Sequence, residues 1–133
     1  MNVDYFCFFV GMGRSGSSVI AAIMDAHPMI VFGNDFTYIP QIINKKITKE
    51  RVIKDIFERT QEQNKKGRLS GKTDGGAYSQ KLDGQIKNWD QNINGIKIIG
   101  SKSMSFTTKV IAVNPKNRLD KIRKMMGPIK VIN

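Results

Sequence analysis

The chain has 133 residues, a length that fits a single domain and lets folding bury a sizeable core. Its hydrophobic content of 40% and charged content of 25% are ordinary for a globular protein and exclude a wholly disordered tail. Lys and Arg total 22 against 11 Asp and Glu, so the net charge is +11 and the expected partners are anionic.

Several partner classes lack their sequence signatures. No RRM, KH, homeodomain or zinc-finger pattern occurs, so we do not expect nucleic acid as the main partner. The apolar run Tyr5–Val10 is too short for a membrane span or a signal-peptide core, which makes the cytoplasm the expected location. Cys7 is the one cysteine, so the chain can form no internal disulfide, and a buried apolar role is expected for it.

The first thirty-five residues predict a strand, a loop, a helix and a second strand. Tyr5–Val10 is a continuous apolar run, typical of a parallel strand that is covered on both faces. A helix should begin near Ser17 and stop near His27, because the proline that follows disfavours helix in the residue before it. Met29–Phe32 is the second expected strand, and a turn should follow at Gly33–Asp35. The helix should present one apolar side, formed by Val19, Ile20, Ile23 and Met24.

The rest of the sequence predicts further helices and strands. A helix with Thr48 as N-cap should run to about Gln63, followed by a long polar loop to residue 77 and a weakly patterned helix to residue 94. Strands are expected at Ile96–Ile99 and Ile129–Ile132. Between them lie a segment over 106–113 that could be helical or extended and a helix capped by Asn117. We therefore expect one α/β domain, a three-layer α/β/α sandwich with a mostly parallel sheet.

The loop from Gly11 to Ser18 carries the most chemical information. A glycine-rich turn between a strand and a helix points successive backbone N–H groups into one concavity, and the helix adds the positive end of its dipole. Arg14 adds a cation with forked donors, and hydroxyl groups come from Ser15, Ser17 and Ser18. The loop therefore predicts a cradle for phosphate or sulfate. A tight turn that needs only glycine would not explain the clustered arginine and serines.

Two other nucleotide-binding patterns come close to this loop. Gly11 and Gly16 have the spacing of a Walker A loop, but Ser17 stands where its lysine belongs, which argues against an ATPase or a kinase. Another Walker-like segment, over 67–73, has one residue too few between its glycines. With Gly13, the loop also satisfies the G-x-G-x-x-G fingerprint, and Asp35 stands where a ribose-binding acid would be expected. A dinucleotide-binding Rossmann-type oxidoreductase that uses NAD or NADP is therefore the alternative interpretation.

Longer stretches of the sequence resemble the sulfotransferases that use 3′-phosphoadenosine 5′-phosphosulfate (PAPS). The likeness is closest to the tyrosylprotein sulfotransferase type, whose opening reads G-x-P-R-S-G-T-T, L-D-A-H-P, G-E-E and I-P. Downstream, Gly100–Ser103 resembles the N-K-D-P segment of that family. The segments that match the opening, with their intervals preserved, are Val10–Ser18, Met24–Pro28, Gly33–Asp35 and Ile39–Pro40.

The resemblance implies a P-loop NTPase-like fold and a role for each matching residue. Asp35 falls on the general base of the family, one methylene shorter than its Glu, and Lys102 falls on the lysine that binds the sulfonate. Arg14 would also stabilise the sulfonate during transfer. No metal is implied, and the acceptor would be a hydroxyl group on a carbohydrate, a lipid, a small alcohol or a peptide tyrosine. The donor-binding residues would be Gly13, Arg14, Ser15, Gly16, Ser17 and Ser18.

The resemblance also implies a missing part. In the family, a strand like Ile129–Ile132 leads into a segment with Arg and, eight residues later, Ser, which binds the 3′-phosphate of PAPS. The sequence ends at Asn133, before such a segment. We therefore expect a fold that is truncated at its C-terminus, and a non-catalytic anion-binding remnant is a further alternative.

Overall fold

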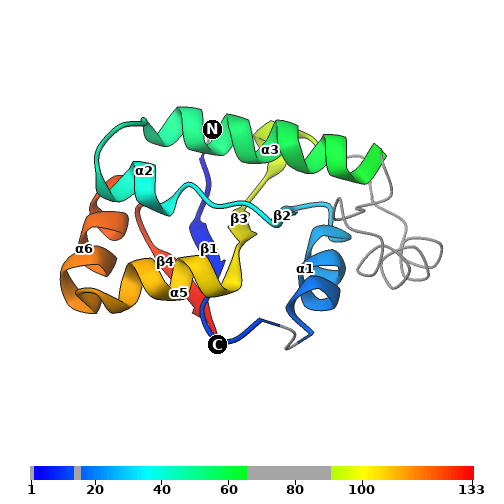
Figure 1. Cartoon of the computed structure of the whole chain (residues 1–133). Helices are drawn as coiled ribbons and strands as arrows, with labels where there is room; N and C mark the ends of the chain where they lie inside the picture. Colours follow the sequence, from blue (N-terminus) through cyan, green and yellow to red (C-terminus); the bar gives the residue numbers. More distant parts are fainter. Residues whose placement is uncertain (1, 14–15, 66–90) are drawn as a thin grey trace.

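The computed structural model describes residues 2–13, 16–65 and 91–133. Within these ranges, four strands form one parallel sheet in the order β2-β3-β1-β4. The strands are β1 (Tyr5–Phe9), β2 (Ile30–Asn34), β3 (Ile98–Lys102) and β4 (Ile129–Ile132). The helices in Figure 1 are α1 (Ser17–Asp25), α2 (Ile39–Ile43), α3 (Lys49–Lys65), α5 (Met104–Ala112) and α6 (Pro115–Met126), with a 3-10 turn, η1, at Ile93–Gly95.

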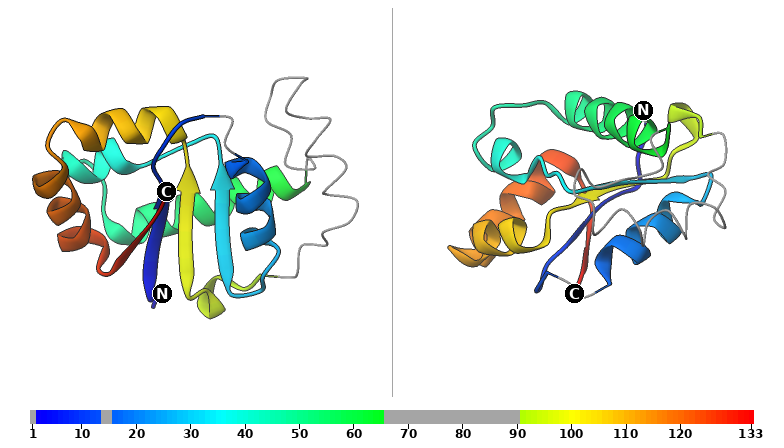
Figure 2. Two further views of the ribbon diagram at one scale, coloured as in Figure 1. Left: turned by 90° about the horizontal axis from the view of Figure 1, so that it is seen from below. Right: turned by 45° about the vertical axis from the view of Figure 1, so that its right-hand side comes forward.

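The two faces of the sheet contribute to two separate cores. Phe6 and Phe8 of β1 belong to the larger core, which α2, α3, α5 and α6 complete. Cys7 and Phe9 alternate with them and belong to a smaller core with Ala21 of α1. Figure 2 shows α1 on one side of the sheet and α3 on the other. The described part is therefore α/β, with helices on both faces of a parallel sheet, and is compatible with the expected three-layer sandwich.

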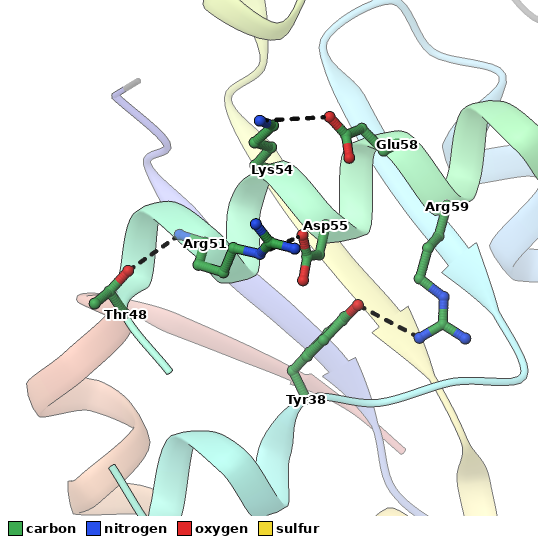
Figure 3. Close-up of polar contacts among 7 residues, drawn as sticks. All are labelled: Tyr38, Thr48, Arg51, Lys54, Asp55, Glu58 and Arg59. Atoms are coloured by element: carbon green, nitrogen blue, oxygen red, sulfur yellow. Dashed lines mark hydrogen bonds and ion pairs between the residues drawn. The ribbon is translucent and has the colours of Figure 1, made fainter. Parts of the chain in front are cut away.

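Helix α3 begins where the sequence predicts. The side-chain oxygen of Thr48 accepts a hydrogen bond from the Arg51 N–H at 3.3 Å (Figure 3). Its exposed side carries ion pairs one turn apart, Arg51–Asp55 at 2.8 Å and Lys54–Glu58 at 3.8 Å. The helix ends at Lys65, two residues beyond the expected end. The side that packs on the sheet is formed by Val52, Ile53, Ile56 and Thr60.

The carboxyl ends of β2 and β3 lie farther along the chain than predicted. The sequence places Gly33 and Asn34 in a turn, but they pair with Ser101 and Lys102 and belong to the sheet. Glycine is required at position 33 because a Cβ there would overlap the ring of Phe36 and crowd the α3 side chain at position 60. The predictions for these strand ends were wrong because glycine and asparagine usually mark turns, whereas here the Phe36 ring and, less closely, Thr60 of α3 pack against the backbone at position 33 and leave no room for a Cβ.

One predicted helix cap also needs correction. Helix α6 is capped by Asn114 and not by Asn117. The Asn117 N–H donates to the side-chain oxygen of Asn114 at 3.3 Å. Pro115 then takes the first helical position, which its fixed φ suits. The segment over 106–113, which the sequence left open between helix and strand, lies mostly within α5. The sequence does not predict the short helix α2.

The buried face of α1 is not the predicted one. Ile20 and Ile23 are 44% and 55% exposed, whereas Ala21 and Ala22 are buried, and the other two predicted core residues are only half-buried. Small alanine side chains let the helix approach the sheet closely. In addition, the fully buried Asp25 accepts a backbone N–H of β2 at 2.7 Å, which fixes the rotation of the helix.

Some expectations lie outside the described residues. These are the glycine-rich segment 67–73, most of the loop predicted to residue 77, and the weak helix as far as residue 90. In the described ranges, no helix combines the length and apolar character needed to cross a membrane. Cys7 is buried, as predicted, and this burial raises the pKa of its thiol to about 11 because the thiolate would lose its hydration.

Candidate functional site

Three parts of the predicted site meet at the carboxyl edge of the sheet. Because β3 lies between β2 and β1, its last residue, Lys102, is flanked by Asp35 after β2 and by the loop after β1. Adjacent strands lie about 4.8 Å apart, so the ends of β2 and β1 are separated by about 10 Å. In open parallel sheets, ligands bind in the crevice outside this edge.

The start of the loop is tied to α5. The Gly11 N–H donates to the Thr108 hydroxyl oxygen at 2.8 Å, and the same oxygen lies 3.0 Å from the Gly11 carbonyl oxygen. Gly11 has a φ of 133°, which glycine adopts far more readily than other residues. Thr108 therefore holds the first bend of the loop. Sequence reasoning missed it because the segment that contains Thr108 could not be assigned to a helix.

The loop enters α1 at Gly16. This residue is the N-cap, has a φ of 82°, and makes no side-chain capping bond. The first N–H groups of a helix have no partner within the helix and carry the positive end of its dipole, so the Gly16–Ser18 corner offers donors to an anion. Ser17 is buried and Ser18 is exposed, and Gly13 is exposed before them. Arg14 and Ser15, the other predicted members, lie outside the described residues.

Lys102 is a buried cation with one loose partner. Its side chain is 8% exposed, and its Nζ lies 3.5 Å from Oδ1 of Asp35, whose side chain is 52% exposed. This separation exceeds that of a strong charge-assisted hydrogen bond. Within the described ranges, the structure gives the ammonium group no other ion-pair partner. Since an ammonium group has three N–H donors and burial is costly without partners, Lys102 retains the capacity to bind an oxyanion.

The carboxylate of Asp35 is placed by a fixed turn. Asp35 has a φ of 59°, a left-handed conformation that Asp tolerates better than most residues. The next N–H, from Phe36, donates to the Lys102 carbonyl oxygen at 3.1 Å. The Arg59 guanidinium lies 4.3 Å from the centre of the Phe36 ring and donates to the Tyr38 hydroxyl at 3.4 Å (Figure 3). The α3 helix therefore secures the segment that presents Asp35.

Asn34 is a site residue that the sequence did not reveal. It pairs with Lys102 in the register of β2 and β3, so the two side chains leave the same face of the sheet. Asn34 is 5% exposed, and its Oδ1 has no hydrogen-bond partner among the described residues. An unpaired buried acceptor costs about 1–3 kcal/mol. Its position at the carboxyl edge therefore marks a place where a ligand or a water molecule would donate a hydrogen bond.

The described donors fit an oxyanion and not a metal ion. They are backbone N–H groups, serine hydroxyls and one ammonium group, with a single carboxylate beside them. Over residues 2–13, 16–65 and 91–133, no group of three or more His, Cys, Asp or Glu residues could hold a metal ion. The left-handed φ of Gly16 is consistent with a cradle for a phosphate or sulfate ester. The orphaned Asn34 oxygen is an acceptor, so its partner would be a donor such as a ligand hydroxyl group or a water molecule and not the oxyanion.

No protein-family model, curated protein or solved structure matches the chain. The likeness to sulfotransferases therefore rests on the short sequence motifs alone.

The geometry argues against the dinucleotide-binding alternative. A Rossmann sheet has the order 3-2-1-4-5-6, with the second strand beside the first. Here β3 separates β2 from β1, so Asp35 is not beside the loop as a ribose-binding acid would be. The third glycine of the fingerprint serves close helix–strand packing. A Cβ on Gly16 would instead meet no described atom within 4 Å, so its backbone conformation alone explains the glycine.

Proposed function

We propose that this chain binds PAPS through the loop between β1 and α1 and transfers its sulfuryl group to a hydroxyl-bearing acceptor. The position of Lys102 carries the proposal. A buried ammonium group lies at the end of β3, between the amide-rich loop and the carboxylate of Asp35. Sulfuryl transfer needs these three groups in this order: donors for the leaving phosphate, a cation for the sulfonate, and a base for the acceptor.

Each described group has a defined task in this proposal. When bound, PAPS would supply the sulfuryl group, whose bond to the 5′-phosphate breaks as the acceptor oxygen bonds to sulfur. The N–H groups at Gly16, Ser17 and Ser18 would hold the 5′-phosphate oxygens. Lys102 would offset the charge that grows on the sulfonate and the bridging oxygen. Asp35 would take the proton that the acceptor hydroxyl loses.

The proposal includes the P-loop NTPase-like fold and the predicted role of Arg14. A glycine- and serine-rich loop that joins the first strand of a parallel sheet to a helix supports the fold. In the protein without bound donor, the ion pair explains how the buried Lys102 cation is tolerated. Asp35 partly neutralises a charge that would otherwise be buried alone. The acceptor class stays open among carbohydrates, lipids, small alcohols and peptide tyrosines.

Substitution of Asp35 by Asn tests the assignment of the base. Asn tolerates the left-handed backbone of this position, whereas Ala would add strain of about 1–2 kcal/mol. We expect D35N to bind 3′-phosphoadenosine 5′-phosphate within about threefold of the unaltered chain in calorimetry. Transfer of radiolabelled sulfate from PAPS to a panel of hydroxyl acceptors should fall by about 10²–10⁴-fold. The control is D120N on the exposed side of α6.

Each outcome decides a separate part of the proposal. Unchanged transfer by D35N would show that Asp35 is not the base. Binding of the nucleotide by the unaltered chain, without transfer to any acceptor, would support a remnant that binds the donor and would refute the transferase. Protection by NADPH together with indifference to 3′-phosphoadenosine 5′-phosphate would establish the dinucleotide alternative.

A further inference from the structure

A hollow of about 230 Å³ lies between α2 and α6, away from the candidate donor site. Its lining residues are Ile42, Lys45, Lys121, Lys124 and Met125. Both helices belong to the layer on the sheet face opposite α1, and Figures 1 and 2 show them at the end of the molecule away from α1. We call this feature the α2–α6 groove.

The groove combines an apolar floor with a basic rim. Ile42 is buried and Met125 is half-buried, so the apolar atoms are recessed, whereas Lys45, Lys121 and Lys124 are exposed. None of the described residues that line the groove carries a carboxylate. No described ion pair involves any of the three lysines. The rim therefore carries three uncompensated cations around a surface that water solvates poorly.

The backbone of Lys45 is fixed at the C-terminal end of α2. Its φ of 53° is left-handed, which is uncommon for a residue with a long side chain. The conformation is fixed, because the Lys45 N–H donates to the Ile42 carbonyl oxygen at 3.1 Å and the Lys46 N–H donates to the Gln41 carbonyl oxygen at 2.9 Å. Glycine would adopt this turn without strain. These two hydrogen bonds form a Schellman motif, a common helix ending with a left-handed residue, so the end of α2 holds the Lys45 backbone at the rim of the groove.

We propose that the α2–α6 groove docks an acidic protein segment that inserts one large apolar side chain and pairs its flanking carboxylates with Lys45, Lys121 and Lys124. The hollow is smaller than the roughly 300–1,000 Å³ of typical small-molecule pockets, but it suits one anchor side chain. A bilayer is engaged by apolar groups that protrude, whereas Ile42 and Met125 are recessed. The net charge of +11 would attract an acidic partner to the protein, and the three lysines of the rim would pair with its carboxylates at the groove.

Fluorescence anisotropy on the full chain tests the proposal, which does not depend on the donor site. The probe is a short fluorescein-labelled peptide with a single Leu between two runs of Glu. We expect it to bind, and we expect about tenfold weaker binding when its Leu is replaced by Ala or when the protein carries K121E and K124E together. The charge-matched control carries K97E and K109E, two exposed lysines outside the groove, and should change the affinity by less than about twofold.

The same assay can overturn the proposal. Equal affinity for the Leu and Ala peptides would show that no apolar side chain inserts into the groove. Equal weakening by the two double variants would show that the peptide responds only to the net charge of the protein. Circular dichroism verifies that all variants fold. Sedimentation with vesicles of phosphatidylcholine that contain about 30% phosphatidylserine tests whether a membrane binds the groove instead. If the vesicles sediment the unaltered chain but not the K121E/K124E variant, while the peptide does not bind, the occupant is a membrane and the proposal is wrong.

Discussion

Substitution of Lys102 by Met separates a ligand-binding role of this residue from a structural one. Met has a similar length and no charge, so it fills the buried space at the end of β3 and removes only the cation. A structural cation and a donor-binding cation predict opposite results. The first would lower the stability of the protein, and the second would lower its affinity for the donor.

The structure sets the expected magnitudes. The partner of Lys102 is a half-exposed carboxylate 3.5 Å away, so the ion pair contributes at most about 1 kcal/mol. Removing a buried charge also relieves its desolvation cost, so the free energy of unfolding should change by less than about 1 kcal/mol in either direction. An ammonium group about 4 Å from an anionic oxygen contributes about 4 kcal/mol at an effective dielectric constant of 20. Donor binding would weaken the contact of Lys102 with Asp35, and this cost is subtracted. Lys102 then contributes about 2–3 kcal/mol to the binding free energy, so K102M should bind the donor product roughly 30- to 160-fold more weakly.

Two assays on the same preparations measure these quantities. Urea denaturation gives the free energy of unfolding, and calorimetry gives the dissociation constant for 3′-phosphoadenosine 5′-phosphate. The matched control is K97M, because Lys97 is an exposed lysine just before β3, at the opposite edge of the sheet. K97M should change neither quantity. A loss of more than about 2 kcal/mol in stability, with unchanged affinity, would refute the reasoning and make Lys102 a structural residue.

The remaining predictions concern single positions. Gly16→Ala should lower the free energy of unfolding by about 1–2 kcal/mol because of the φ of 82°, whereas Gly95→Ala, at another open position without a positive φ, should cost less than about 0.5 kcal/mol by chemical denaturation. Cys7 should resist iodoacetamide at pH 8 in the folded protein and react on unfolding. The pKa of its thiol, about 11, lies above the ordinary value of 9.0, so the stability linked to the neutral thiol is present below pH 9 and is lost between about pH 9 and 11. A pH series of denaturation curves measures this loss. Asp25→Ala should cost about 2–4 kcal/mol, since it removes a buried carboxylate that accepts hydrogen bonds from the β2 backbone and from Asn64. Exposed Asp120→Ala should cost under about 1 kcal/mol in the same denaturation curves.

Hydrophobic periodicity and capping chemistry explain how much of the fold could be predicted. The apolar run of β1, the Thr48 cap of α3 and the parallel sheet follow from local signals that the structure confirms. The ends of β2 and β3 do not follow, because Gly33 is typical of a turn and only the structure shows the Phe36 ring packed against its backbone. The rotation of α1 could not be predicted either, since a buried acceptor at Asp25 outweighs the burial of two isoleucines.

The candidate site shows the same division. Its loop, Asp35 and Lys102 could be selected from the sequence, because glycine, charge and motif spacing are local features. Thr108 and Asn34 could not, because their importance depends on contacts across 97 residues for Thr108 and on the strand pairing for Asn34. The order of the strands was also beyond the sequence, although it alone places Lys102 between the loop and Asp35.

Nitrogen-15 correlation spectra of the chain during titration with 3′-phosphoadenosine 5′-phosphate test the central claim most directly. Saturable shifts should be largest for the amides of Gly16, Ser17 and Ser18 at the start of α1, with smaller shifts at the end of β3. If those amides stay in place while the nucleotide perturbs only other surfaces, such as the lysines of the α2–α6 groove, then this loop does not bind the donor and the proposed function is wrong.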